Sequence, residues 1–355
     1  MRDNRTWSQS ARAHISAGGL AKSWLFRCFG LLLTVFSAWV PAAAQCYVFV
    51  PTHKSNSVAV IDSLADRVVA VVPVQVQPLS VAISPNGAYA YVTNSGWIFN
   101  SDSVSVIDTV TLQVVATIPV GQFPVGVAFT PNGAFAYVAN SVSNNVSVIN
   151  TATNAVVATI PAGSSPWGVA VAPKGDFAYV TNENSNSVSV ISTATNTVVN
   201  TVSVGFKPLG VAVTPDAAYA YVVNQNSGTV SVISTATNAV TNTVFVGGAP
   251  WTIAITPNGA RAYVTNAATP SSITSTVAVI DIPSNTVVTS VTVGTQPHGV
   301  AITPDGAYAY VSNFYDNSAS VIDTSTNTVV DTVAGVASFP EAVAITLRPQ
   351  AQKCR

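Results

Sequence analysis

Charged residues are scarce in this sequence. Asp, Glu, Lys and Arg make up 8% of its 355 residues, whereas average globular proteins carry about a quarter. The chain has only three histidines and three cysteines, and these form neither a metal-ligand cluster nor a Cys-x-x-Cys-His haem site. The Gly-x-Ser-x-Gly motif of serine hydrolases is also absent. The sequence therefore predicts no metal, no cofactor and no serine nucleophile of that type.

Long hydrophobic runs are absent beyond Val40. No stretch there approaches the roughly 20 apolar residues of a membrane-spanning helix. Hydrophobic residues nevertheless make up 48% of the chain, and they alternate with Thr, Ser and Asn. This alternation, together with the many Val, Thr and Tyr residues, is typical of β-strands. We therefore expect an all-β protein.

The first 44 residues differ from the rest. They contain five basic residues and one acidic residue, and they end in an uncharged segment, residues 28–44, that closes with three alanines. This pattern predicts a signal peptide over residues 1–44, cleaved after Ala44, and an exported domain over residues 45–355 that is periplasmic, secreted or attached to the cell surface. An uncleaved membrane anchor and a lipid anchor on Cys46 are the alternatives.

The charge of the predicted mature domain argues against nucleic-acid binding. Removing one acidic and five basic residues from the 14 and 13 of the whole chain leaves 13 and eight, a formal charge of −5. Proteins that bind nucleic acid carry basic patches that neutralise phosphates. We therefore expect no nucleic-acid partner, and membrane contact only through the export signal.

One unit is repeated along the chain. A tyrosine followed by Val recurs at intervals of 42 to 47 residues, at Tyr47, Tyr91, Tyr137, Tyr179, Tyr221, Tyr263 and Tyr310. Each full unit contains four strand-like runs separated by Gly, Asn and Ser turn signals, for example over residues 167–205. Four short strands in about 40 residues describe one blade of a β-propeller. We name these strands a to d, from the central channel outward.

The repeated phrases resemble those of a known family. YVTN (residues 91–94 and 179–182), VSVID (residues 104–108) and VAVTPDA (residues 211–217) are similar to the YVTN family of β-propeller repeats, and the resemblance covers nearly all of residues 46–347. It implies a propeller fold. For function it implies extracytoplasmic binding or surface proteins.

The two ends of the chain complete each other. The first strands, from Tyr47, have no strand a before them, and the last run, residues 341–347, is a strand a with no strand b after it. We therefore predict a seven-bladed β-propeller with four antiparallel strands per blade, whose closing blade is built from both termini. Cys46 and Cys354 flank that junction. A disulfide between them is favoured over two free thiols in an exported protein.

Two features predict a binding face. The variation in repeat length lies between strands b and c, in loops at residues 51–57, 94–103 and 266–276. The second of these loops contains Trp97, Ile98 and Phe99, an apolar segment that we predict to contact a partner. Simple tolerance of loop insertions is the alternative.

The second feature is the residue that follows a proline at the start of each strand a. These seven positions are expected to surround the channel mouth, and they are Leu79, Val125, Trp167, Leu209, Trp251, His298 and Glu341. Two tryptophans with a polar pair are suited to a sugar or another small amphipathic ligand. Plugging of the channel by bulky side chains is the competing interpretation.

Taken together, these features favour an exported, non-enzymatic binding or interaction module, with the b–c and d–a loops on its binding face. The expected partner is a protein, a glycan or a small molecule at the cell surface or in the periplasm, and the chain is expected to be a monomer. Two alternatives stay open. One is a lactonase-like propeller hydrolase that uses His298 and Glu341 as an acid–base pair, and the other is a structural component of a surface layer.

Overall fold

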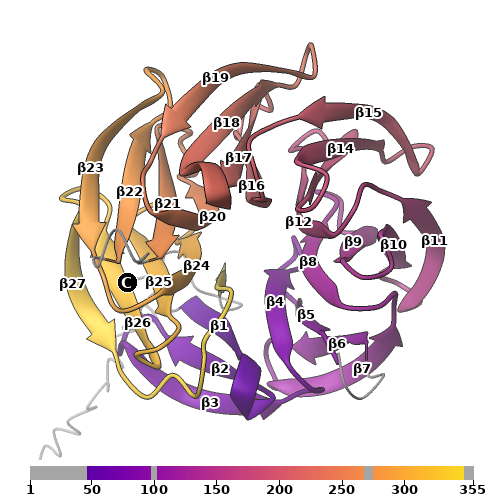
Figure 1. Cartoon of the computed structure of the whole chain (residues 1–355). Coiled ribbons are helices and arrows are strands. Elements are labelled where there is room, and N and C mark those ends of the chain that lie inside the picture. Colours follow the sequence, from indigo (N-terminus) through magenta and orange to yellow (C-terminus); the bar gives the residue numbers. More distant parts are fainter. Residues whose placement is uncertain (1–45, 97–101, 268–274, 348–355) are drawn as a thin grey trace, which may run out of the picture. The chain divides into compact units, whose positions relative to one another are not determined.

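The computed structural model describes residues 46–96, 102–267 and 275–347. These residues form seven four-stranded antiparallel sheets arranged around a central channel (Figure 1). The prediction of a seven-bladed β-propeller is thus confirmed. Helix is confined, among the described residues, to the short 3-10 segments η1 (His53–Ser55) and η2 (Gln225–Ser227). In this part of the chain, no helix has the length and apolar character needed to cross a membrane.

The blades are given from the innermost to the outermost strand. Blade 1 consists of β28 (Ala344–Leu347), β1 (Cys46–Thr52), β2 (Ser57–Asp62) and β3 (Arg67–Pro73). Blade 2 consists of β4 (Pro78–Ile83), β5 (Tyr89–Asn94), β6 (Ser103–Asp108) and β7 (Gln113–Pro119). Blade 3 consists of β8 (Pro124–Phe129), β9 (Phe135–Asn140), β10 (Asn145–Asn150) and β11 (Ala155–Pro161). Blade 4 consists of β12 (Pro166–Val171), β13 (Phe177–Asn182), β14 (Ser187–Ser192) and β15 (Thr197–Ser203). Blade 5 consists of β16 (Pro208–Val213), β17 (Tyr219–Asn224), β18 (Thr229–Ser234) and β19 (Ala239–Phe245). Blade 6 consists of β20 (Ala249–Ile255), β21 (Arg261–Ala267), β22 (Thr276–Asp281) and β23 (Thr286–Thr292). Blade 7 consists of β24 (Pro297–Ile302), β25 (Tyr308–Asn313), β26 (Ser318–Asp323) and β27 (Thr328–Val333).

Burial follows the position of a strand within its blade. The two middle strands are almost wholly buried, as in β2, where all six residues are buried, because neighbouring blades cover both of their faces. The outer strand alternates between exposed and covered residues, as in β3. The strand nearest the channel is partly exposed to it, as in β12. The scarcity of charge follows from this packing, since burying an unpaired charge is costly.

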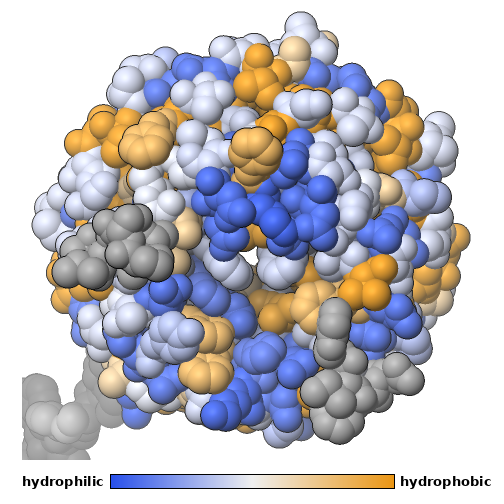
Figure 2. All heavy atoms as spheres, in the orientation of Figure 1, coloured by the Kyte–Doolittle hydropathy of each residue, from blue (hydrophilic) through white to orange (hydrophobic). Residues whose placement is uncertain are grey.

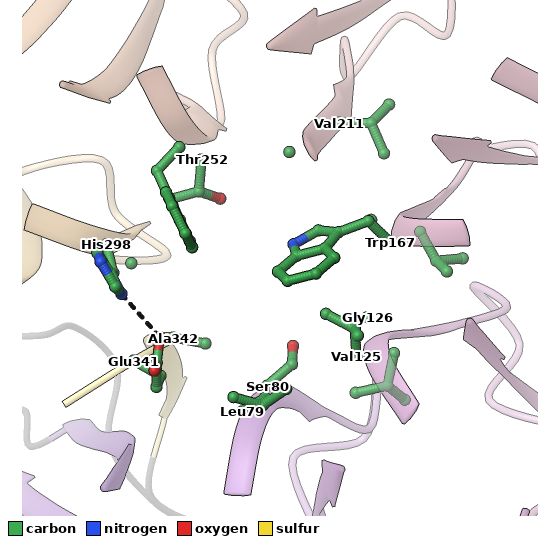
Figure 3. A pocket seen from close by; sticks show the side chains of 16 residues that line it. Leu79, Ser80, Val125, Gly126, Trp167, Val211, Thr252, His298, Glu341 and Ala342 are labelled. Atoms are coloured by element: carbon green, nitrogen blue, oxygen red, sulfur yellow. Dashed lines mark hydrogen bonds and ion pairs between the residues drawn. The ribbon is translucent and has the colours of Figure 1, made fainter. Parts of the chain in front are cut away.

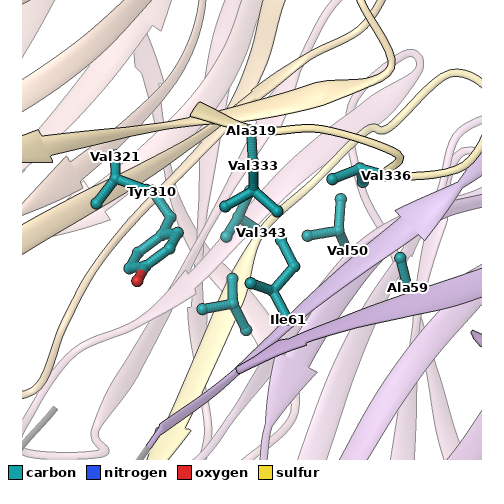
Figure 4. Close-up of a cluster of buried hydrophobic side chains, with 10 residues drawn as sticks. Val50, Ala59, Ile61, Tyr310, Ala319, Val321, Val333, Val336 and Val343 are labelled. Atoms are coloured by element: carbon teal, nitrogen blue, oxygen red, sulfur yellow. The ribbon is translucent and has the colours of Figure 1, made fainter. Parts of the chain in front are cut away.

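The hydrophobic core consists of separate clusters between adjacent blades. The cluster in Figure 4 joins blade 7 to blade 1 and includes Tyr310 and Val321 on one side and Val50 and Ile61 on the other. Burying an aliphatic side chain of this size stabilises the fold by roughly 1.5–3 kcal/mol. Since equivalent clusters join the other blades, the stability of the ring depends on every blade being present.

A buried tyrosine also links most blades to the next. The hydroxyl of Tyr91 in blade 2 donates a hydrogen bond to Asn154 Oδ1 in the c–d turn of blade 3, at 2.7 Å. The same bond recurs from Tyr137, Tyr221 and Tyr263 to Asn196, Asn285 and Asn327. Around the closure, Tyr310 of blade 7 donates to Asp66 of blade 1 at 2.9 Å.

The structure corrects the repeat alignment in blade 1. In blade 2 the repeat tyrosine, Tyr91, pairs with Val106, and the equivalent pair in blade 1 is Phe49 with Val60. Tyr47 pairs instead with Asp62, which is the equivalent of the Tyr89–Asp108 pair. The repeat tyrosine is therefore replaced by Phe49, two residues from the predicted position. The error arose because residues two apart in a strand share one face.

This register also explains an exception in the neighbouring turn. Phe49 has no hydroxyl, and the turn position that holds Asn154 in blade 3 holds Leu112 in blade 2. Leu112 packs against the cluster that contains Phe49. With the corrected register, the link from Thr52 to Ser57 has the same length as that from Asn182 to Ser187, so the prediction of a long loop at residues 51–57 was wrong.

The closing blade is built from both ends of the chain, as predicted. Strand β1 pairs antiparallel with β28 through four residue pairs, from Cys46 with Leu347 to Phe49 with Ala344. β28 begins at Ala344, three residues later than predicted. The preceding segment still contacts β1, because the amide of Glu341 donates to the carbonyl of Pro51 at 2.9 Å. The pairing between this segment and β1 is interrupted just before β28, and the innermost strands of other blades show a register shift at the same place, after their proline.

The buried tyrosines give the fold a specific response to alkaline pH. Burial raises the pKa of Tyr91, Tyr179, Tyr221 and Tyr263 to about 12, and it also raises the pKa of Tyr137 and Tyr310. An unfolded tyrosine has a pKa near 10. Since the folded pKa is the higher one, the stabilisation is complete below about pH 10 and is lost as the pH rises through about 12. We expect one cooperative unfolding transition in that interval. Circular dichroism and tyrosinate absorbance, followed together, measure it; ionisation of these tyrosines near pH 10 with unchanged dichroism would contradict this account.

Candidate active site at the channel mouth

The b–c and d–a loops lie on one face of the propeller. The amide of Ser95 in a b–c loop donates to the carbonyl of Gln77 in a d–a loop at 3.0 Å, and equivalent bonds recur in later blades. On the face drawn in Figure 2, hydrophilic residues gather around the opening of the channel. Each d–a loop ends at a buried proline, such as Pro166, and in six of the seven blades the next residue reaches the channel mouth.

Six of the seven residues predicted for the mouth line one cavity. They are Leu79, Val125, Trp167, Trp251, His298 and Glu341. The seventh, Leu209, is 2% exposed and lies outside the lining, where its neighbours Gly210 and Val211 take its place. The cavity has a volume of about 150 Å³, a size that holds a single six-membered ring. In Figure 3 the indole of Trp167 extends across the opening toward the side on which His298 and Glu341 lie.

His298 and Glu341 form a hydrogen-bonded pair inside this cavity. Nδ1 of His298 lies 2.8 Å from Oε2 of Glu341 (Figure 3), and the two side chains are 11% and 13% exposed. They come from blade 7 and from the segment leading into blade 1, 43 residues apart in the sequence. A carboxylate that accepts a hydrogen bond from Nδ1–H holds a neutral imidazole in the tautomer whose Nε2 is free to act as a base.

Aromatic rings hold the imidazole of His298 from both sides. The ring of Trp251 stacks on one face at 4.3 Å with an interplanar angle of 6°, and the ring of Phe314 stacks on the other at 4.4 Å and 26°. Phe339 continues the stack on Phe314 at 4.6 Å. Trp167 meets Trp251 edge to face at 6.3 Å. The imidazole therefore has little freedom to tilt, which is the arrangement that a general base requires.

Two hydroxyl groups hold the backbone of this pair. Thr265, in the repeat position of the T in YVTN, donates to the carbonyl of His298 at 2.9 Å and accepts from the amide of Thr252 at 3.1 Å. Ser312, at the same position of blade 7, accepts from the amide of Gly299 at 2.8 Å and donates to the carbonyl of Glu341. Each hydroxyl bridges the innermost strand of its own blade to the corresponding segment of the next one.

Sequence reasoning missed Phe314, Phe339, Thr265 and Ser312. Phe314 had a signal that could have been used, because the residue after the repeat asparagine is small or polar in the other blades, as at Ser95, Ser141 and Glu183. Phe339 precedes the proline of its strand, as Gln77 and Gln296 do in other blades. Thr265 and Ser312 carried no such signal, since their residue types also occur where no catalytic group is near.

Other predicted sites lie partly outside the described residues. Trp97, Ile98 and Phe99 fall there, as do the leader and Cys354, so the predicted partner loop and the Cys46–Cys354 bond stay predictions. Cys46 itself is fully buried at the start of β1. Within residues 46–96, 102–267 and 275–347, no group of three or more His, Cys, Asp or Glu is placed to hold a metal ion.

Fold and mouth together define the class: a seven-bladed β-propeller with a histidine–carboxylate pair in its channel. Two overlapping segments, residues 72–157 and 152–241, match the model of the family described as "Lactonase, 7-bladed beta-propeller". A search among curated proteins found no match. The family match covers less than half of the chain and supports a seven-bladed propeller, while membership of the YVTN repeat family is not shown by it.

Solved structures share the fold at low sequence identity. A candidate 6-phosphogluconolactonase from Bacteroides uniformis is 16% identical, with a TM-score of 0.72, and the match covers 85% of this chain and 100% of that one. A second, from Bacteroides fragilis, is 17% identical, with a TM-score of 0.71 and coverage of 85% and 98%. Kuenenia stuttgartiensis hydrazine synthase is 20% identical, with a TM-score of 0.68 and coverage of 76% and 95%.

These findings correct the predicted function. The prediction of a non-enzymatic binding module is wrong, because the match to the lactonase family model favours the alternative of a lactonase-like enzyme. The error had an identifiable cause. The enzyme interpretation was set aside because few histidines and carboxylates were available, but hydrolysis of an activated ester needs only one oriented base.

Proposed function

We propose that this protein is a lactonase-like hydrolase that acts at the channel mouth, with His298 as general base and Glu341 as its orienting partner. The observation that carries the proposal is the 2.8 Å hydrogen bond between these two side chains inside the ring-sized cavity. The match to the lactonase family model supports it. The aromatic stack on both faces of the imidazole supports it as well.

The chemistry needs water, a base and a proton donor. Nε2 of His298 removes a proton from a water molecule, whose oxygen attacks the lactone carbonyl and forms a tetrahedral oxyanion. When the ring C–O bond breaks, the imidazolium returns that proton to the departing alkoxide, and the product is a hydroxy acid. Glu341 holds the proton on Nδ1 throughout and stabilises the imidazolium that forms between the two steps. No metal ion is required by this sequence of steps.

Trp167 is expected to bind the substrate ring without taking part in proton transfer. Trp167→Ala should raise KM several-fold, corresponding to the loss of about 1 kcal/mol of stacking, with kcat little changed. Trp251→Ala is the matched comparison. It removes the ring that stacks on His298, so it should lower kcat as well. Steady-state hydrolysis of a neutral lactone, with the melting temperature of each variant, measures both effects. If Trp167→Ala lowers the melting temperature and leaves KM unchanged, the side chain merely plugs the channel.

We also propose that the repeats are of the YVTN type and that the domain is exported after removal of residues 1–44. The repeated phrases and the basic, then apolar, then alanine-rich start support this. The intact mass of exported protein should correspond to a chain that begins at Gln45. A retained leader, or the added mass of a lipid on Cys46, would rule this processing out.

A further inference from the structure

The lining of the channel mouth carries no fixed positive charge. Sixteen residues line the cavity, and none of them is Lys or Arg; the only ionisable side chains among them are His298 and Glu341. Because Glu341 is the bonded partner of His298, the pair carries a net charge of zero when the imidazole is protonated and −1 when it is neutral. An anionic group in this cavity would therefore lie beside a carboxylate with no counterion.

The lysines described on the same face contact residues outside the lining of the cavity. Lys207, in a d–a loop, lies 2.8 Å from Glu183 Oε1 and 2.6 Å from Asn184 Oδ1. Lys54, in η1, lies over the ring of Phe339 at 5.3 Å from its centroid. Residues 46–347 contain 13 acidic residues and only five Lys or Arg. The surrounding field therefore repels anions on approach as well.

The walls of the cavity suit a flat, uncharged ring. The indole of Trp167 borders the opening (Figure 3), and it meets Trp251 at an interplanar angle of 87°. Leu79 and Val125 add aliphatic surface. Aromatic and aliphatic walls of this kind bind the apolar faces of a neutral ring, while His298 and Glu341 are the polar groups that orient its ester.

We infer that the substrate is an uncharged, single-ring lactone and that phosphorylated sugar lactones are excluded. The inference rests on the proposed lactonase function and specifies its substrate class. It separates this protein from the two Bacteroides proteins of similar fold, which are named for a phosphorylated sugar lactone. The physical reason is the missing counterion, since a phosphate dianion is strongly disfavoured beside a carboxylate whose only partner is an imidazole and that has no Lys or Arg near it in the cavity lining.

A matched pair of substrates tests the inference. Glucono-δ-lactone and its 6-phosphate ester share the same ring and differ by the phosphate, so a comparison of kcat/KM isolates the effect of charge. We expect the neutral lactone to be preferred by on the order of a hundredfold, with the preference diminishing as salt screens the repulsion. Equal kcat/KM values, or a preference for the phosphate ester, would overturn the inference while leaving the lactonase function intact.

Binding is measured separately from hydrolysis. The lactams that correspond to the two lactones keep the ring and the carbonyl but resist hydrolysis, and calorimetry gives their affinities. If neither lactone is hydrolysed but only the neutral lactam binds, the lactonase proposal fails and the charge preference stands. If neither lactam binds or both bind equally, the inference about the pocket is wrong.

A gain-of-function variant completes the test. Leu79 lines the cavity, and its carbonyl accepts a hydrogen bond from the amide of Ala342, the neighbour of Glu341, at 3.3 Å. Leu79→Lys should raise kcat/KM for the phosphate ester about tenfold, because it supplies a cationic partner for the phosphate. Leu79→Met, a side chain of similar length without charge, is the control and should leave the selectivity unchanged. If a folded Leu79→Lys variant, checked by its melting temperature, shows no gain, charge does not determine the selectivity.

Discussion

Replacing His298 with glutamine is expected to reduce kcat/KM for a neutral lactone by about 10²–10⁴-fold, the contribution typical of a positioned general base. Glutamine keeps a polar planar group between Trp251 and Phe314 but cannot accept the proton of the attacking water. Because His298 is held by stacking and by its bond to Glu341, the imidazole is in place before substrate arrives. Steady-state kinetics measures the loss, and the melting temperature shows whether the variant is still folded.

His53 provides the matched control, as the other histidine among the described residues. It lies in η1, outside the lining of the cavity, and His53→Gln should retain full activity. The activity of Glu341→Gln should lie between the activities of these two variants, since the amide keeps the geometry but can hold the wrong imidazole tautomer. Wild-type rates in a folded His298→Gln variant would remove His298 from the mechanism and, with it, the proposed site.

Cys354→Ser is expected to lower the free energy of unfolding by up to about 5 kcal/mol, if Cys354 is bonded to Cys46. The bond would close a loop that spans nearly the whole domain, and loops of that length lose the most entropy on closure in the unfolded chain. Equilibrium denaturation under oxidising conditions measures the change. The variant is chosen because it leaves the buried Cys46 side chain in place, so any loss reflects the bond and not a packing defect in β1.

The location of the first opening is a second result expected from the same variant. β1 and β28 are held together by strand pairing and not by a connecting turn, so they should lose protection from hydrogen exchange before the middle blades do. Reduction of the wild-type protein should reproduce this pattern. Two free thiols in native exported protein would refute the bond, and uniform exchange over all seven blades after reduction would show that strand pairing alone holds the ring.

The repeat in the sequence was sufficient to predict the architecture. Strand periodicity, turn residues and a unit of about 42 residues determine four-stranded blades, and the incomplete units at the two ends determine that they share a blade. The same pattern placed the residue after the proline at the channel mouth in every blade but that of Leu209, which is buried. It did so because each repeat has the same local geometry, so position in the repeat determines position in the ring. The register of β1 was the exception, since Tyr47 and Phe49 lie on the same face of one strand and the sequence alone does not separate them.

What only the tertiary structure decided is the geometry in which these residues meet, including that of the His298–Glu341 pair, which the sequence offered as an alternative without a distance or an orientation. His298 and Glu341 are far apart in the sequence, and the bond between them depends on ring closure bringing blade 7 against blade 1. The rings of Trp251 and Phe314 that stack on His298 come from blades 6 and 7 and from different positions of the repeat, and the hydroxyls of Thr265 and Ser312 come from one repeat position in the same two blades. The composition suggested too few histidines and carboxylates for catalysis, but catalysis depends on how a few groups are oriented. That orientation arises from packing between blades, which a periodic sequence signal does not encode.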